Sequence, residues 1–250
     1  MATFCLIHGA WHGGWAWDAL SAELQTRGHE VVAPDLPCDD TTAGVVEYAA
    51  VARTALGGDE DAIVVGHSLG GLTIPLVPAR LRVFLCALVA GTGGTDVFVP
   101  GFGASRTRDE LGRSYYPDSA DAARELQYPP SLASLAAKLR PQAPVEVSTP
   151  YVADGPTAYV VCTSDAAIRP DWQRRLARDV LGVEPIELAS GHSPMLSCPH
   201  ELADVLDALV VDGYESPRCS ASPSRRSTTS ASSPSDSSER ATSRARSSKS

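Results

Sequence analysis

Apolar residues occur along this chain in short continuous runs, separated by longer stretches in which they recur every three or four positions. A continuous run, unlike an alternating one, is typical of a strand buried on both faces, and such strands form largely parallel sheets. We therefore predict strands at Phe4–Ile7, Glu30–Ala33, Ala62–Val65, Arg82–Val89, Ala158–Cys162 and Glu184–Leu188.

The stretches between these strands have the apolar spacing of helices that cover a sheet. Strands and helices in alternation predict an α/β fold, with a mostly parallel sheet of about six strands, helices on both faces and right-handed crossovers. Pro75 should kink or shorten one of the helices, because proline disrupts a helix interior. The predicted helices are Ala16–Arg27, Thr42–Ala55, Leu69–Val77, Asp171–Leu181 and Glu201–Val211.

Two segments depart from this alternation. Residues 91–156 are rich in proline and irregular apart from a helical stretch at Ser131–Arg140, and a connection of this length is typical of a cap over a functional site. From Tyr214 onward, 15 of the last 37 residues are serine and few are apolar, which predicts disorder. We expect one domain over residues 1–213, with an inserted cap, and a Ser/Arg-rich tail over residues 214–250.

The segment 62–71 carries the first indication of chemistry. An apolar, β-branched run leads into Gly66-His67-Ser68-Leu69-Gly70, and helix-forming residues follow. Gly-x-Ser-x-Gly in this strand–turn–helix setting is typical of a nucleophilic serine on a tight, strained turn. We predict Ser68 as the nucleophile of a serine hydrolase.

A serine hydroxyl becomes a nucleophile only when a base takes its proton, and the base needs an acid to orient it. In this type of sheet the acid follows the serine along the chain, and the histidine that acts as base follows the acid. His192 lies on a loop after the last predicted strand, where open α/β sheets gather their ligands, whereas His200 starts a helix and suits a surface or capping role. Asp165 ends the preceding strand and is the predicted acid. Asp171 at a helix start and Asp154 in the insertion are the alternatives.

The reaction also requires donors for an oxyanion. The backbone N–H of Leu69, directly after the nucleophile, is one predicted donor, and that of Ala10, in the glycine-rich loop after the first strand, is the other. His8 and His12 in that loop have a spacing that could suggest metal ligands. The glycines between them argue against a helix, and no acidic residue is near, so we predict no metal and no other cofactor.

Several of these segments together resemble the α/β-hydrolase family of plant methylesterases and hydroxynitrile lyases, with its bacterial esterase relatives. The resemblance covers about residues 3–95 and 157–211 and does not extend to the insertion. It implies an α/β-hydrolase fold without a hairpin before the first strand, a Ser68–Asp165–His192 triad, and Ala10 and Leu69 as oxyanion donors. The segments that carry it are residues 8–17, 33–36, 66–71, 159–165 and 192–196.

The same family supplies an alternative activity. Its hydroxynitrile lyases carry threonine, glutamate and lysine at the positions where this chain has Gly9, His67 and Ser193. The cation that would stabilise a cyanide leaving group is therefore missing, and a carboxylesterase acting on a small ester is favoured. Acyl transfer uses the same residues as hydrolysis and stays open, as does a non-catalytic protein that binds a small ligand.

Composition limits which classes of partner and which cellular compartment we expect for this protein. Residues 1–213 contain 14 basic and 27 acidic residues, which argues against binding nucleic acid. We expect no secretory leader and no membrane-spanning segment, because the apolar runs are much shorter than a bilayer requires. None of the six cysteines has metal-site or dithiol spacing, which favours a reducing, cytoplasmic compartment.

Aromatic residues in the insertion suggest an apolar ester as the substrate, but they suit packing within a cap equally well. The oligomeric state cannot be read from the sequence.

Overall fold

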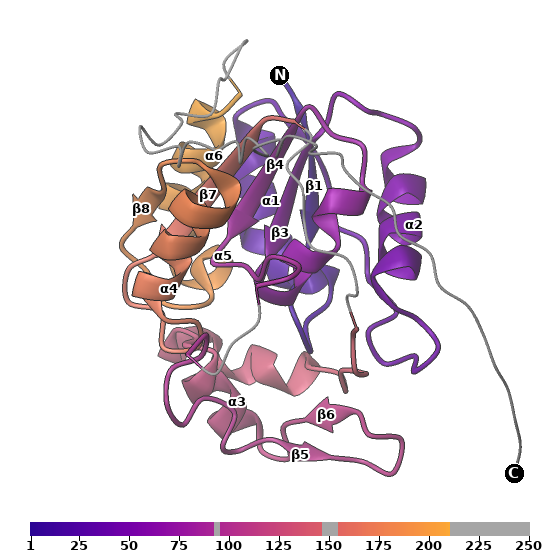
Figure 1. Ribbon diagram of the computed structural model, residues 1–250, viewed down its shortest axis with the longest axis vertical. Coiled ribbons are helices and arrows are strands. Elements are labelled where there is room, and N and C mark those ends of the chain that lie inside the picture. The colour runs from indigo at the N-terminus through magenta and orange to yellow at the C-terminus, as the bar shows by residue number, and fades with distance from the viewer. Residues whose placement is uncertain (93–95, 147–154, 211–250) are drawn as a thin grey trace, which may run out of the picture. The chain divides into compact units, whose positions relative to one another are not determined.

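Six parallel strands form one sheet in the order β2-β1-β3-β4-β7-β8, in a computed structural model that describes residues 1–92, 96–146 and 155–210 (Figure 1). The predicted α/β fold with a parallel sheet is confirmed. The predicted tail, residues 214–250, and the alternative acid Asp154 lie outside the described residues. The strands are β1 (Thr3–Ile7), β2 (Glu30–Val32), β3 (Ile63–His67), β4 (Leu81–Leu85), β7 (Thr157–Cys162) and β8 (Ile186–Leu188).

Two strands are shorter than predicted by two residues or more, for local reasons. β4 ends at Leu85 instead of Val89, because Cys86 takes a φ of 37°, outside the extended region. β8 begins at Ile186, after Pro185, which has no N–H to donate to a neighbouring strand.

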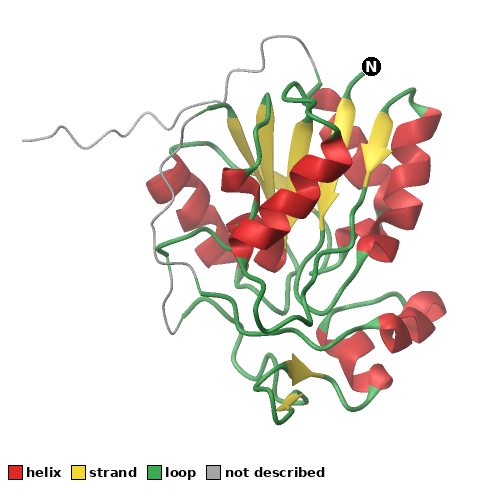
Figure 2. Cartoon of the chain, turned by 90° about the vertical axis from the view of Figure 1, so that its right-hand side faces the viewer, coloured by secondary structure: helices red, strands yellow, loops and turns green. Residues whose placement is uncertain are grey.

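Helices cover both faces of the sheet (Figure 2). The helix predicted after Ser68 is replaced by two short 3₁₀ turns, the second of which has Pro75 in its first turn, so proline shortens the helix as expected. The predicted helix over 171–181 begins as an α-helix and ends as a π-helical turn. The helices of the sheet domain are η1 (Gly14–Trp17), α1 (Asp18–Thr26), α2 (Val45–Leu56), η2 (Ser68–Leu72), η3 (Ile74–Leu76), α4 (Pro170–Arg175), η5 (Leu176–Leu181), α5 (Pro194–Ser197) and α6 (Pro199–Ala208).

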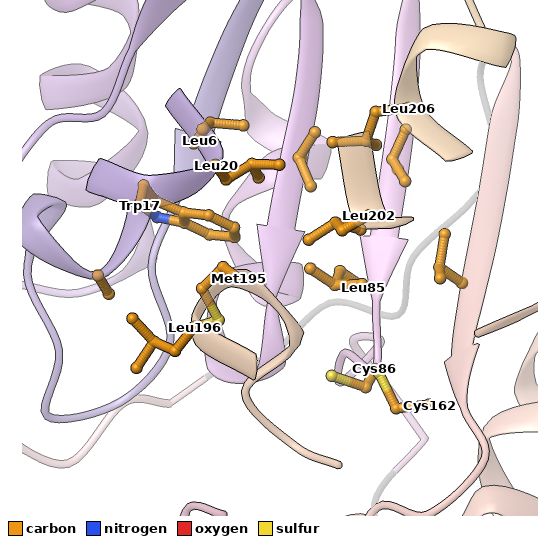
Figure 3. Close-up of a cluster of buried hydrophobic side chains, with 14 of the residues drawn as sticks. Leu6, Trp17, Leu20, Leu85, Cys86, Cys162, Met195, Leu196, Leu202 and Leu206 are labelled. Carbon is orange, nitrogen blue, oxygen red and sulfur yellow. The ribbon is translucent and has the colours of Figure 1, made fainter. Parts of the chain in front are cut away.

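Alternate residues of each strand enter two separate cores, because successive side chains of a strand point to opposite faces. In β1, Phe4 and Leu6 join the core under α1, α5 and α6, whereas Cys5 and Ile7 join the core under α2, α4 and η5. Figure 3 shows the first core, with Trp17 and Leu20 opposite residues of α5 and α6. Since β3 is buried along its whole length, the residue that follows it has a rigid support.

Between β4 and β7 the chain forms a cap at the end of the sheet toward which the strands point (Figures 1 and 2). Backbone hydrogen bonds join it to the sheet domain, including Arg140 N–H to the Trp11 carbonyl at 2.8 Å and Val99 N–H to the Ala167 carbonyl at 2.9 Å. None of the described helices is both long and apolar enough to cross a membrane. The elements of the cap are β5 (Thr107–Arg108), β6 (Ser114–Tyr115), α3 (Ser119–Glu125) and η4 (Pro130–Lys138).

Candidate active site

Ser68 is the first residue of η2, directly after β3, and has a φ of 51°, a left-handed conformation that residues with side chains rarely adopt. Two glycines make the turn possible. A Cβ at Gly66 would lie 2.7 Å from the side chain of Ile74, and one at Gly70 would lie 2.7 Å from the carbonyl oxygen of Ile7. The backbone strain, of order 1 to 3 kcal/mol, is held by this close packing.

The structure brings the three predicted residues together at the carboxyl end of the sheet. The His192 Nε2 lies 3.2 Å from the Ser68 Oγ, and the His192 Nδ1 lies 2.9 Å from the Asp165 Oδ2. Asp165 and His192 are buried, and Ser68 is half-buried. Because the carboxylate accepts the proton of Nδ1, Nε2 is left to accept a hydrogen bond from the serine hydroxyl.

The Asp165 carboxylate is fully satisfied by hydrogen-bond donors. Its Oδ1 accepts from the backbone N–H groups of Ala167 (2.7 Å) and Ile168 (2.9 Å), and its Oδ2 accepts from Gln173 Nε2 (2.8 Å) as well as from His192. Gln173 is completely buried in α4 and also accepts from the N–H of Cys162 at 3.1 Å. Sequence reasoning missed Gln173, because nothing separates it from a surface glutamine.

A second glutamine, Gln127 of the cap, joins the loops that carry the acid and the histidine. Its Oε1 accepts from the N–H groups of Ala166 (2.7 Å) and His192 (2.8 Å), and its Nε2 donates to the Ser164 carbonyl (2.9 Å). Beside it, Ser193 donates to the Leu126 carbonyl at 2.6 Å. The cap therefore holds the backbone of His192 and the side chain of Ser193, a role that no sequence pattern revealed.

His67 and Cys86 support the loop of His192 from below. The His67 Nε2 donates to the His192 carbonyl at 2.7 Å, and the Cys86 thiol donates to the same oxygen at 3.6 Å. Possible ligand atoms of these three residues lie within 4.8 Å of one another, the one such group in the described residues. The donor set does not suit a metal, since both His192 nitrogens are engaged and burial raises the pKa of the Cys86 thiol well above its usual range.

Ala10 and Leu69 are the predicted oxyanion donors. Both line the same cavity as Ser68. Leu69 is in the first turn of η2, where N–H groups have no acceptor within the helix, and the Ala10 N–H donates to no acceptor in the described part of the chain. Gly9 permits the close approach of this loop, because a Cβ there would lie 2.9 Å from the Cβ of Ser68.

The two histidines of the first loop are buried and use both ring nitrogens. The His12 Nδ1 donates to the Ala10 carbonyl (2.8 Å), and its Nε2 accepts from the Tyr128 hydroxyl (2.7 Å). The His8 Nε2 accepts from the N–H of Leu36 at 3.0 Å. Burial lowers the pKa of His8 to about 4 and that of His12 to about 3, so both rings are neutral at pH 7. They hold the loop that carries Ala10.

The alternative residues lie elsewhere. His200 is exposed on α6 and hydrogen-bonds Glu23 at 3.0 Å, and that bond raises the pKa of its imidazole. Asp171 pairs with Arg169 at 2.9 Å at the start of α4. Neither is among the residues that contact Ser68 or His192 in the described structure.

A cavity of about 170 Å³ opens over Ser68, between the sheet domain and the cap. The sheet domain contributes Trp11, Leu88 and Ile168, and the cap contributes Phe98 and Phe102, so most of the wall is apolar. The polar groups in it are the candidate site itself and the side chains of Arg106, Ser114 and Gln142. Such a pocket, largely apolar with a few placed polar groups, is typical of a site for a small molecule.

Comparison with known protein families shows to which family the chain belongs. The model of the alpha/beta hydrolase family matches residues 6–205, which is most of the chain.

Curated relatives and solved structures cover nearly the same region. Salicylic acid-binding protein 2 of Nicotiana tabacum is 29% identical over 80% of this chain and 93% of its own length. Methyl jasmonate esterase 1 of Vitis vinifera is 27% identical over 83% of this chain and 96% of its own. The crystal structure of a pyrethroid hydrolase from Sphingobium faniae JZ-2 matches with a TM-score of 0.69 at 24% identity, over 83% of this chain and 96% of that one.

Proposed function

Because the chain belongs to the alpha/beta hydrolase family, we propose that it is a serine carboxylic-ester hydrolase that works through an acyl-enzyme. The observation that carries the proposal is the hydrogen-bonded series from Asp165 through His192 to Ser68, at the floor of a largely apolar cavity. The names of the curated relatives, methylesterases and a methyl jasmonate esterase among them, support ester hydrolysis in general.

In the first half of the reaction, His192 Nε2 takes the proton of Ser68 Oγ while the oxygen attacks the ester carbonyl. The negative charge that develops on the carbonyl oxygen is held by the N–H groups of Leu69 and Ala10, and the dipole of the turn after Ser68 adds to this stabilisation. Asp165 keeps the imidazole in the required tautomer and stabilises its cation. The alcohol leaves with the proton from His192.

In the second half, a water molecule takes the place of the alcohol. His192 removes a proton from the water, which attacks the acyl group on Ser68, and the same imidazole then returns a proton to the serine oxygen. An alcohol that enters instead of water would give acyl transfer, so the two outcomes differ only in the acceptor. A lyase reaction lacks support, because the residue after the histidine is Ser193, which donates to a carbonyl and carries no charge.

The proposed substrate is a small ester with a largely apolar body. The walls formed by Trp11, Phe98, Phe102 and Ile168 support this assignment, since burial of apolar area is the main source of affinity in such a pocket.

We place the protein in a reducing compartment such as the cytoplasm. Cys5, Cys38, Cys86 and Cys162 are buried and free, and none of them forms a disulfide within the described residues. Burial raises the pKa of the Cys5 thiol to about 12 and that of Cys38 to about 11, so these groups stay protonated and act as small apolar side chains.

The direct test of the proposed function is the Ser68→Ala variant. We expect it to keep the far-UV circular dichroism and melting temperature of the wild type and to lose p-nitrophenyl butyrate turnover by at least about a thousand-fold. Ser119→Ala, at an exposed position in α3, is the matched control and should keep full turnover. Turnover that survives in purified Ser68→Ala would assign the reaction to another nucleophile.

A further inference from the structure

The cavity over Ser68 contains one cation whose presence the proposed ester hydrolysis does not explain. Arg106 comes from the cap, just before β5, and its half-buried side chain lines the cavity together with Ser68 and His192. Its guanidinium carbon lies 4.8 Å from the centre of the Trp11 ring and 5.0 Å from that of the Phe102 ring.

These two rings connect Arg106 to the reacting groups. The Phe102 ring is 6.2 Å from the His192 ring, centre to centre, and Trp11 follows directly after the predicted oxyanion donor Ala10. Trp11 is fixed in turn, because its indole N–H donates to Ser114 at 3.0 Å. Contacts of a cation with two aromatic faces hold it in place without neutralising its charge.

Arg106 has no acidic partner among the described residues. Its Nε donates to the Gly103 carbonyl at 3.4 Å, and its two NH₂ groups donate to no described residue. The carboxylate of Glu125 is engaged by other donors, the N–H groups of Gly103 (2.8 Å) and Ser105 (3.0 Å) and the Tyr116 hydroxyl (3.1 Å). The charge of Arg106 is therefore left for something that enters the cavity.

The chain also leaves room for this side-chain position. A Cβ built on Gly103 would overlap the guanidinium of Arg106, and Gly103 has a φ of +83°, which favours glycine. The absence of a side chain at Gly103 thus lets Arg106 fold back over its own loop, between the two rings.

We propose that the substrate is an ester that carries a free carboxylate, which binds Arg106 while the ester carbonyl lies at Ser68. The inference rests on the proposed ester hydrolysis. It keeps the apolar body of the proposed substrate and adds one anionic group to it. A planar guanidinium with two free NH₂ groups suits a carboxylate, which can accept from both. In an apolar pocket such a charge favours an anionic ligand over a neutral one of the same shape.

The test compares acid and amide forms of one ester in two series. Monomethyl adipate carries the carboxylate on the acyl side, and 5-(butanoyloxy)pentanoate carries it on the alcohol side; the primary amide of each is the neutral partner of the same size. The measured quantity is the ratio of kcat/KM for the acid to kcat/KM for the amide. In the wild type we expect the ratio to exceed one in at least one series.

In that series, Arg106→Met should lower the ratio by at least about ten-fold, the effect expected when a hydrogen-bonded charge loses its partner. Arg106→Lys should give an intermediate ratio, because it keeps the charge and loses the planar pair of donors. Arg108→Met, two residues away and exposed, is the matched control and should leave the ratio unchanged.

The outcomes separate the two proposals. Suppose that p-nitrophenyl butyrate is turned over in a manner that depends on Ser68. If the protein then prefers neither acid over its amide, or if Arg106→Met leaves such a preference intact, the carboxylate inference alone is overturned. If no ester is turned over in a manner that depends on Ser68, the proposed function fails and the inference fails with it.

Discussion

Ser68 keeps a left-handed backbone conformation, and it is not alone in doing so around the site. The described residues other than glycine with positive φ are Trp11 (66°), Ser68 (51°), Cys86 (37°) and Gln127 (57°), and each of them lines the cavity or contacts a residue of the candidate triad. Strained backbone of this kind persists only where the surroundings fix it. The fold thus concentrates its local strain where side chains must be aimed.

At the residue scale, we predict that Gln173 positions Asp165. Gln173→Leu removes the donor to Asp165 Oδ2 and leaves the buried N–H of Cys162 without its acceptor. We expect kcat for p-nitrophenyl butyrate to fall about ten-fold with KM little changed, and the free energy of unfolding in urea to fall by about 1 to 3 kcal/mol. Gln25→Leu, the same change at an exposed position of α1, should affect neither. An unchanged kcat in Gln173→Leu would contradict the positioning role.

At the element scale, the cap does more than cover the cavity. Gln127, just past the end of α3, hydrogen-bonds three backbone groups in the two loops that follow β7 and β8. These loops extend from different strands and are fixed at one end by the sheet. The amide of Gln127 joins the two loops beside the hydrogen bond from the Ser164 N–H to the Ser190 carbonyl (2.9 Å), and so helps to fix the contact of Asp165 with His192.

Gln127→Leu should therefore loosen the site without opening the sheet. We expect kcat/KM for p-nitrophenyl butyrate to fall about ten-fold, because a small displacement of the imidazole is costly to the reaction. The circular dichroism spectrum should match that of the wild type. Gln25→Leu is again the control for a glutamine without such contacts. A kcat/KM within two-fold of the wild type would show that the two loops keep their places without Gln127.

The helices, strands and loops also show which parts of the fold and of the candidate site could be predicted from the sequence. All six strands could be predicted. The inner strands are apolar runs whose residues enter two buried cores, and the edge strands β2 and β8 still carry valine, isoleucine or leucine that packs against those cores. Ser68, Asp165 and His192 could be brought together because a parallel sheet collects the ends of its strands at one edge. Gln127 and Gln173 could not be found, since their contacts span long loops and an amide in a helix or turn is common on any surface. No pattern in the sequence of the cap indicated that Arg106 would lie beside the half-buried ring of Phe102.

At the scale of the whole molecule, buried neutral histidines make stability depend on pH. In the unfolded chain an imidazole takes up a proton near pH 6.5, whereas folded His8 does so only near pH 4 and His12 near pH 3. Between these values the unfolded chain binds more protons than the folded one, so acid favours unfolding. The contribution of these two residues to stability is complete above pH 6.5 and is lost as the pH falls.

We predict that the free energy of unfolding falls by about 1.4 kcal/mol per pH unit for each of the two histidines between about pH 6 and pH 4. Urea unfolding at pH 7, 6, 5 and 4.5 measures this slope. His12→Gln should reduce the slope by about half of that combined contribution. His200→Gln, at an exposed residue whose pKa is raised, should not reduce it. A slope that is unaffected by His12→Gln would contradict the neutral, buried state of that ring.

If His192 and Asp165 activate Ser68 as a nucleophile, a reagent that reacts covalently with activated serines should label it. Wild-type protein should react with a fluorophosphonate probe at one site, and peptide mass spectrometry should place the label on Ser68. His192→Ala should label far more slowly, because the hydroxyl then lacks its base. A wild-type protein that is folded but unlabelled, or labelled at a residue other than Ser68, would show that Ser68 is not the activated nucleophile.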